Sequence, residues 1–141
     1  MKEIRLQIPA LADYIDIVRV CLFGIASKLS FSYEDIEDMK VAVSEACNNA
    51  VLHGSRTSQH HNIDICFESR EHSLTIKISN KGHSFKHEDA LENASPLPAT
   101  DISELPVGGL GIYLMQALMD EVTVETTDNI TQVTLVKFLT A

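Results

Sequence analysis

Residues 43–54 read VSEACNNAVLHG, and residues 107–113 read VGGLGIY. In the first stretch, Glu45 and Asn49 are four residues apart, so on a helix their side chains point the same way, one turn apart. The second stretch is a glycine-rich turn at the start of another helix, where free backbone amides favour anionic ligands. One segment can hold a metal ion and the other can wrap phosphates, so together they predict a nucleotide site.

Apolar residues on either side of these stretches recur with the periods of strands and helices. Ile4, Leu6 and Ile8 alternate with polar residues, and Pro9 ends this predicted strand. Helices are predicted over 11–29, over 33–53 with Ser32 as the N-cap, and over 109–119, with a further short helix over 86–93. A hairpin is predicted from 63–67 and 74–78, a break at 80–83, and two last strands over 122–126 and 130–138.

This order of elements predicts an α+β fold. Helices pack on one face of a mostly antiparallel sheet, which makes a two-layer α/β sandwich. The length of 141 residues fits one domain, residues 1–141. Residues 95–106 hold Pro96, Pro98 and Pro106 with almost no periodicity. Long loops of this kind are often lids or binding loops, so we expect a lid over about 94–108.

Composition narrows the choice of partners and compartment. The formal charge is −9, from 11 basic and 20 acidic residues, so a nucleic acid surface would repel the protein and a basic protein is a better partner. No apolar run approaches the roughly 20 residues of a membrane span, and residues 1–5 do not resemble a signal peptide. Cys21, Cys47 and Cys66 lack C-x-x-C spacing and are predicted to be reduced thiols in the core of a cytoplasmic protein.

The helix over 33–53 carries the groups for metal and proton chemistry. Asn49 can coordinate a hard cation through its carbonyl oxygen, which leaves positions for water and phosphate oxygens. Glu45 can accept a proton from a hydroxyl nucleophile or orient it. The alternative is a solvated helix face that carries these polar groups by chance. No set of histidines has the spacing of zinc ligands.

The glycine-rich turn is the candidate phosphate site. Gly108, Gly109, Leu110 and Gly111 lack the Lys-Ser/Thr of a P-loop and the full G-x-G-x-x-G pattern. Glycines there let the backbone approach phosphates closely. The alternative is a flexible hinge before a core helix.

A third group of residues is the candidate site for the nucleobase of the nucleotide. Asn80 at a strand end can present its amide oxygen to the exocyclic amine of a base, and Gly82 permits a tight turn beneath it. Thr131, near the start of the last strand, can point its hydroxyl toward the same pocket. The alternatives are an ordinary turn and a strand-edge threonine.

These residues resemble a known family. Residues 36–50 read IEDMKVAVSEACNNA and are similar to the metal-binding box of the bacterial anti-sigma factor serine kinases, which belong to the GHKL ATPase superfamily. Residues 108–122 read GGLGIYLMQALMDEV and are similar to the lid-hinge box of the same family. The resemblance covers about residues 4–138.

The resemblance implies a function and roles for several residues. Such proteins hold a sigma factor inactive and use Mg-ATP to phosphorylate a serine on a small anti-sigma-factor antagonist, a STAS-type protein. By this resemblance Asn49 is the Mg²⁺ ligand and Glu45 the catalytic base or the group that positions the hydroxyl. Gly109 and Gly111 wrap the phosphates. Family members usually form homodimers, which implies the same here.

The sequence departs from the family at the turn that contacts adenine. That turn normally begins with Asp and often reads D-x-G-x-G, whereas this chain has Asn80 and Ser84 at the Asp and second glycine positions. A neutral amide accepts hydrogen bonds roughly half as strong as those of a carboxylate, so we expect weaker or altered nucleotide binding. A second interpretation follows: a partner-switch module with little catalysis that regulates transcription by protein–protein binding.

Overall fold

The computed structural model describes residues 1–54, 62–81, 109–128 and 130–140. Its elements follow the predicted order: β1 (Lys2–Pro9), the 3₁₀ turn η1 (Ala12–Tyr14), α1 (Ile15–Lys28), α2 (Tyr33–Gly54), β2 (Asn62–Ser69), β3 (Ser73–Lys81), α4 (Gly109–Leu118), β4 (Glu121–Thr127) and β5 (Ile130–Phe138). The short helix predicted over 86–93 and the predicted lid over about 94–108 lie outside the described residues.

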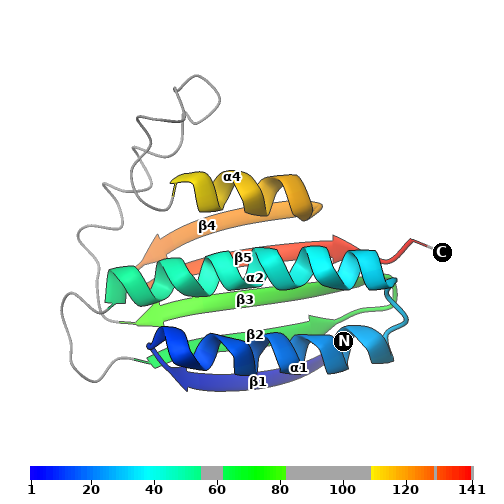
Figure 1. Ribbon diagram of the computed structural model, residues 1–141, viewed down its shortest axis with the longest axis horizontal. Coiled ribbons are helices and arrows are strands. Elements are labelled where there is room, and N and C mark those ends of the chain that lie inside the picture. Colours follow the sequence, from blue (N-terminus) through cyan, green and yellow to red (C-terminus); the bar gives the residue numbers. More distant parts are fainter. Residues whose placement is uncertain (55–61, 82–108, 129, 141) are drawn as a thin grey trace.

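The strands form one sheet in the order β1-β2-β3-β5-β4, and each neighbouring pair is antiparallel. Helices α1, α2 and α4 lie side by side on one face of this sheet (Figure 1). The predicted α+β sandwich is therefore confirmed. In the described part of the chain, no helix combines the length and the apolar character needed to cross a membrane.

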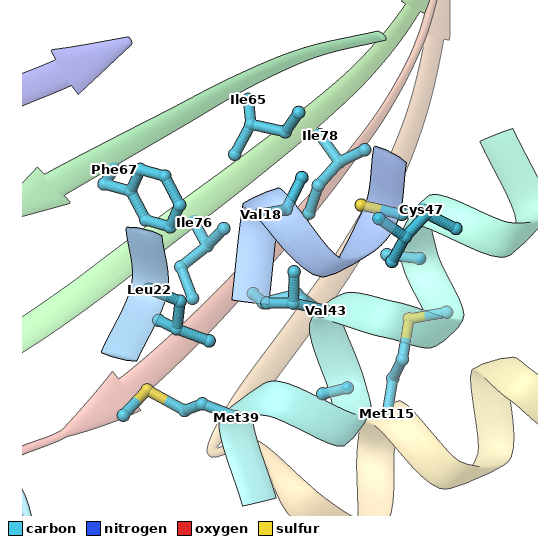
Figure 2. Packing of buried hydrophobic residues seen from close by; sticks show 14 of the residues in the cluster. Val18, Leu22, Met39, Val43, Cys47, Ile65, Phe67, Ile76, Ile78 and Met115 are labelled. Carbon is cyan, nitrogen blue, oxygen red and sulfur yellow. The ribbon is translucent and has the colours of Figure 1, made fainter. Parts of the chain in front are cut away.

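The core lies between the sheet and the helix layer. Alternate residues of β2 and β3 point inward, and α1, α2 and α4 bury their apolar faces against them. Figure 2 shows this packing, with side chains from all of these elements meeting in one cluster. Among the largest fully buried side chains are Val18, Leu22, Met39, Val43, Ile65, Phe67, Ile76, Ile78 and Met115. The helix that carries Glu45 and Asn49 therefore rests on a rigid base.

The predicted ends of the elements hold in most places. The backbone N–H of Asp35 donates to Ser32 Oγ at 3.1 Å, which confirms Ser32 as the N-cap of α2. The break predicted at residues 80–83 begins too early, since Asn80 and Lys81 still belong to β3 and pair with Thr131 and Ile130 of β5. Pairing with a second strand here overrides the local preference for a turn.

The three cysteines are all free thiols. Cys47 is fully buried in the core, and burial raises the pKa of its thiol to about 12. Cys66 is buried, as predicted, but it lies outside the main core cluster between the sheet and the helices. Strand alternation explains this, because Ile65 and Phe67 face the helices and the residue between them faces the other side of the sheet.

The burial of Cys47 gives a prediction about thiol reactivity. Because the thiolate is the reactive form, a buried thiol with a raised pKa reacts slowly. At pH 8, iodoacetamide is expected to label the half-buried Cys21 well before Cys47 in the native protein, as measured by peptide mass spectrometry. Denatured protein, in which all three thiols react alike, is the control. Equal labelling of both residues in the native state would contradict the burial of Cys47.

Candidate functional site

The two stretches that the sequence singles out meet in the structure. Glu45 and Asn49 lie on α2, and Gly111 lies in the first turns of α4, which packs against α2. A Cβ atom placed on Gly111 would lie 3.0 Å from Glu45 Oε2, 3.4 Å from Asn49 Nδ2 and 3.7 Å from Asn49 Oδ1. The acid, the amide and the glycine-rich turn therefore form one cluster.

The packing of α4 explains why a glycine sits at this point. Met115 is fully buried and points toward α2 beside Val43 and Cys47 (Figure 2). Gly111 precedes Met115 by four residues, so both lie on the face of α4 that meets α2. A Cβ atom at residue 111 would crowd the carboxylate of Glu45 and lie in contact with the amide of Asn49.

Asn80 joins the sheet to the same end of α2. It follows Ile76 and Ile78 on the inward face of β3 and is 3% exposed. Its Nδ2 donates a hydrogen bond to the backbone carbonyl of Ala50 at 3.2 Å, and Ala50 is the residue after Asn49. The orientation of the Asn80 amide is therefore set in part by α2.

Thr131 lies next to Asn80. The two residues are paired across β3 and β5, and Thr131 is half-buried. The hydroxyls of Thr131 and Thr126 on β4 are 3.3 Å apart, within hydrogen-bond distance. Thr131 is thus paired with Asn80, and its hydroxyl has the structural contact of a sheet threonine.

Of the other predicted site residues, two are in the described part of the chain and two are outside it. Leu110 is 53% exposed, so its contribution to a phosphate site would come from its backbone amide. Gly109 begins α4, where the first N–H groups have no partner within the helix. Gly82 and Gly108 lie outside the described residues.

Sequence reasoning missed the carbonyl of Ala50 as the partner of Asn80. The alternation of Leu74, Ile76 and Ile78 was the available signal that residue 80 points toward α2.

The chemistry of this cluster fits a metal-nucleotide complex. Asn49 offers an amide oxygen, a donor type that Mg²⁺ accepts in proteins, and Glu45 offers a carboxylate that can accept a proton. Both side chains are half-buried and lie against the N-terminal turns of α4. A helix start of this kind favours negative charge such as phosphate.

A second cluster of possible metal ligands lies on the opposite face of the sheet. One ligand atom from each of Glu3, Cys66 and Glu68 falls within 4.8 Å of the others, beside a hollow of about 630 Å³. Their charges are already compensated, because Lys77 Nζ lies 2.8 Å from Glu68 and Arg5 Nε lies 2.9 Å from Glu3. Burial raises the pKa of the Cys66 thiol, which disfavours the thiolate that binds metals. This cluster is an ion-pair network and does not fit a metal centre.

We compared the sequence and the structure of this chain with those of known proteins. The family model described as "Histidine kinase-like ATPase domain" matches residues 8–137. The serine-protein kinase RsbW of Bacillus licheniformis is 42% identical over 137 residues, which cover 96% of this chain and 85% of the relative. RsbW of Bacillus subtilis strain 168 is 38% identical over the same shares. A crystal structure of the RsbU and RsbW domains of a Mycobacterium tuberculosis protein has a TM-score of 0.69 at 17% identity, and covers 98% of this chain and 33% of that one.

The tether between Asn80 and Ala50 gives a stability prediction. Asp at this position has no N–H to donate and sets a carboxylate oxygen against a buried carbonyl oxygen. Asn80→Asp is therefore expected to lower the free energy of unfolding by about 1–3 kcal/mol, as measured by urea denaturation. Asn48→Asp, which adds the same charge at an exposed residue of α2, is the control and should change stability by less than about 0.5 kcal/mol. Equal stability of the two variants would refute the structural role of the tether.

Proposed function

Because this chain belongs to the histidine kinase-like ATPase domain family, we propose that it is a serine-protein kinase that uses ATP to phosphorylate a partner protein. Its RsbW relatives are named serine-protein kinases and match it over nearly its whole length. The observation that carries the proposal is the contact of Gly111 with Glu45 and Asn49. It unites the acid, the amide and the start of α4 at one point.

Each residue of this cluster has a role in the proposed reaction. The amide oxygen of Asn49 would hold Mg²⁺, which neutralises charge on the phosphate oxygens when it is bound. The backbone amides at Gly109, Leu110 and Gly111 would hold phosphate oxygens, with Gly108 before them. Glu45 would orient the serine hydroxyl and accept its proton. Phosphoryl transfer depends mainly on positioning and charge neutralisation, which these groups supply.

The adenine of ATP would lie against the sheet, beside the C-terminal part of α2. Asn80 and Thr131 are neighbours there, and the resemblance assigns the adjacent Gly82 to the same turn. Asn80 donates through Nδ2 to Ala50, and an amide oxygen is a group that can accept from the exocyclic amine of adenine. This role needs an amide oxygen and no negative charge.

The family resemblance also suggests the partners. We propose that the chain binds a sigma factor, that its substrate is a STAS-type anti-sigma-factor antagonist, and that it acts as a homodimer in the cytoplasm. The formal charge of −9 favours basic surfaces on the partner proteins. It also disfavours direct contact with nucleic acid.

A second candidate function is a partner-switch module with little catalysis. The observation that favours it is Asn80, which stands where the family has Asp and whose amide nitrogen is engaged by the backbone of α2. A neutral acceptor holds adenine less tightly than a carboxylate does. The protein would then regulate its partners by binding alone.

One experiment separates the two functions. The purified chain is incubated with Mg-ATP and its cognate STAS-type antagonist, and phosphoserine is measured by mass spectrometry. We expect one phosphoserine on the antagonist. Its absence at saturating ATP, together with retained binding of the sigma factor, would support the binding module and refute the kinase.

The first variant tests the metal ligand. Asn49→Ala removes the amide oxygen, so Mg²⁺ is no longer expected to increase the affinity for ATP, as measured by calorimetry with and without the ion. Asn48→Ala is the control, because residue 48 points about 100° away on the helix and is exposed. If Mg²⁺ increases the ATP affinity of Asn49→Ala as it does that of the native protein, Asn49 is not the ligand.

The second variant tests the proton acceptor. Glu45→Gln keeps the size of the side chain but removes its basicity, so the rate of phosphoryl transfer is expected to fall by about 10²- to 10⁴-fold. The affinity for ATP should change little, because Glu45 acts on the hydroxyl. A variant as active as the native protein would dismiss this role.

A matched variant on the facing helix α4 tests whether the position of the Glu45 carboxylate matters. Gly111→Ala places a Cβ atom 3.0 Å from Glu45 Oε2 and displaces the carboxylate without removing it. Ala favours helix over Gly by up to about 1 kcal/mol, so the fold should remain intact. Phosphoryl transfer should fall while the stability does not, which distinguishes a displaced base from an unfolded protein.

A further inference from the structure

The C-terminal end of α4 is joined to β5 and to the start of α2 by one side chain, that of Lys137. Lys137 Nζ donates a hydrogen bond at 2.7 Å to the backbone carbonyl of Leu118, the last residue of α4. The same Nζ lies 3.9 Å from Oδ1 of Asp35, in the first turn of α2. The Lys137 side chain is only 12% exposed. One ammonium group, largely removed from water, therefore connects three elements.

The surroundings of Lys137 suit a positive charge and little else. Removing an ammonium group from water is costly unless it finds hydrogen-bond acceptors and an opposite charge. The carbonyl of Leu118 is such an acceptor, since the last carbonyls of a helix have no partner within it and favour a cation. Asp35 supplies the opposite charge. An apolar side chain here would extend the core beyond Leu135 without this cost, so the charge indicates a specific role at the end of α4.

A second contact fixes the same end of α4. The backbone N–H of Phe138 donates to Oδ2 of Asp120 at 2.7 Å, and the backbone N–H of Asp120 donates to the carbonyl of Val136 at 2.9 Å. Strand β5 thus holds this end through its backbone as well as through Lys137. Figure 1 shows the last turn of α4, the end of β5 and the first turn of α2 together, at the end of the molecule where the C-terminus is marked.

The opposite end of α4 carries the candidate phosphate site. Gly109, the first residue of α4, lies about 9 Å along the helix axis from Met115, which is fully buried against α2. A tilt of α4 by about 5–10° around Met115 would move its first N–H groups by about 1 Å. A shift of this size takes a hydrogen bond out of its favourable range of distance. The contacts at the C-terminal end therefore set where the first N–H groups point.

We propose that Lys137 is a positioning residue for phosphate binding, which acts from the far end of α4 by fixing the tilt of that helix. Its ammonium group acts through α4 and needs no contact with the nucleotide. This role rests on the proposed binding of ATP phosphates at the start of α4. Thr131, beside the proposed adenine site, lies six residues from Lys137 on β5, about 20 Å along the strand. Lys137 should therefore influence the phosphates and not the base.

The test compares the affinities for Mg-ATP and for adenosine, both measured by NMR titration, which also reaches weak binding. Lys137→Met keeps an unbranched side chain but removes the ammonium group. Its affinity for ATP is expected to fall about tenfold, which corresponds to about 1.4 kcal/mol. Its affinity for adenosine should change by less than about twofold. A variant that is only less stable would lose both affinities in the same proportion, because both ligands need the folded chain.

Lys77→Met is the matched control. Lys77 Nζ lies 2.8 Å from Glu68 on the face of the sheet away from the helices, so this variant loses a similar ion pair without touching α4. Both of its affinities should equal those of the native protein. Lys137→Arg keeps a positive charge and an N–H donor, so it should recover most of the affinity for ATP.

Asp120→Ala tests the same end of α4 through its other contact. Asp120 is exposed, so this variant should fold even if Lys137→Met does not. It removes the acceptor for the N–H of Phe138 and should cause the same selective loss of ATP affinity. Gln116→Ala changes another exposed residue of α4 and should bind both ligands as the native protein does.

The results separate a wrong role for Lys137 from a wrong function. A native protein that binds no ATP refutes the proposed function, and this role of Lys137 with it. A native protein that binds ATP, together with Lys137→Met and Asp120→Ala variants that bind it equally well, refutes the role of Lys137 alone. Equal loss of ATP and adenosine affinity in these variants also refutes it, because Lys137 would then only stabilise the fold.

Discussion

The close contact of α4 with α2 at Gly111 is the constraint on which the site depends. A Cβ atom at this residue would lie 3.0 Å from Glu45 Oε2 and 3.4 Å from Asn49 Nδ2, so a glycine lets the two helices meet here without displacing these polar groups. Met115, one turn further along α4, fixes the approach because it is fully buried between the helices and the sheet. The geometry of the polar cluster is therefore set by apolar packing directly behind it.

The sheet connects this helix contact to Asn80 and Thr131, the candidate residues for binding the nucleobase. Asn80 lies on the inward face of β3 and donates to the carbonyl of Ala50, so this hydrogen bond joins the end of the strand to the C-terminal part of α2. Pairing of Asn80 with Thr131 connects them to β5, and the Thr126–Thr131 contact adds β4. Residues from α2, β3 and β5, far apart in the sequence, are thus held at one end of the molecule by buried contacts.

Much of this arrangement could be predicted from local patterns. The four-residue spacing of Glu45 and Asn49 fixes their common face, and the glycines of 108–111 indicate a close approach at the start of α4. Strand alternation predicts the inward face of β2 and β3. Applied to Cys66, strand alternation also predicts that this side chain faces away from the helices. Patterns of this kind depend on neighbours in sequence, which is why they suffice here.

What could not be predicted depends on contacts between distant residues. The end of β3 is set by its pairing with β5, so a turn-like sequence at Asn80 and Lys81 remains in the strand. The acceptor for Asn80 is a backbone carbonyl. Every residue has a backbone carbonyl, so the sequence does not show which one is the acceptor. This contact also changes how the departure from the family pattern is understood. An aspartate at residue 80 would lose the hydrogen bond to α2, whereas asparagine donates to the helix through Nδ2. The amide therefore has a structural role that a carboxylate could not fill, since it joins the end of β3 to α2.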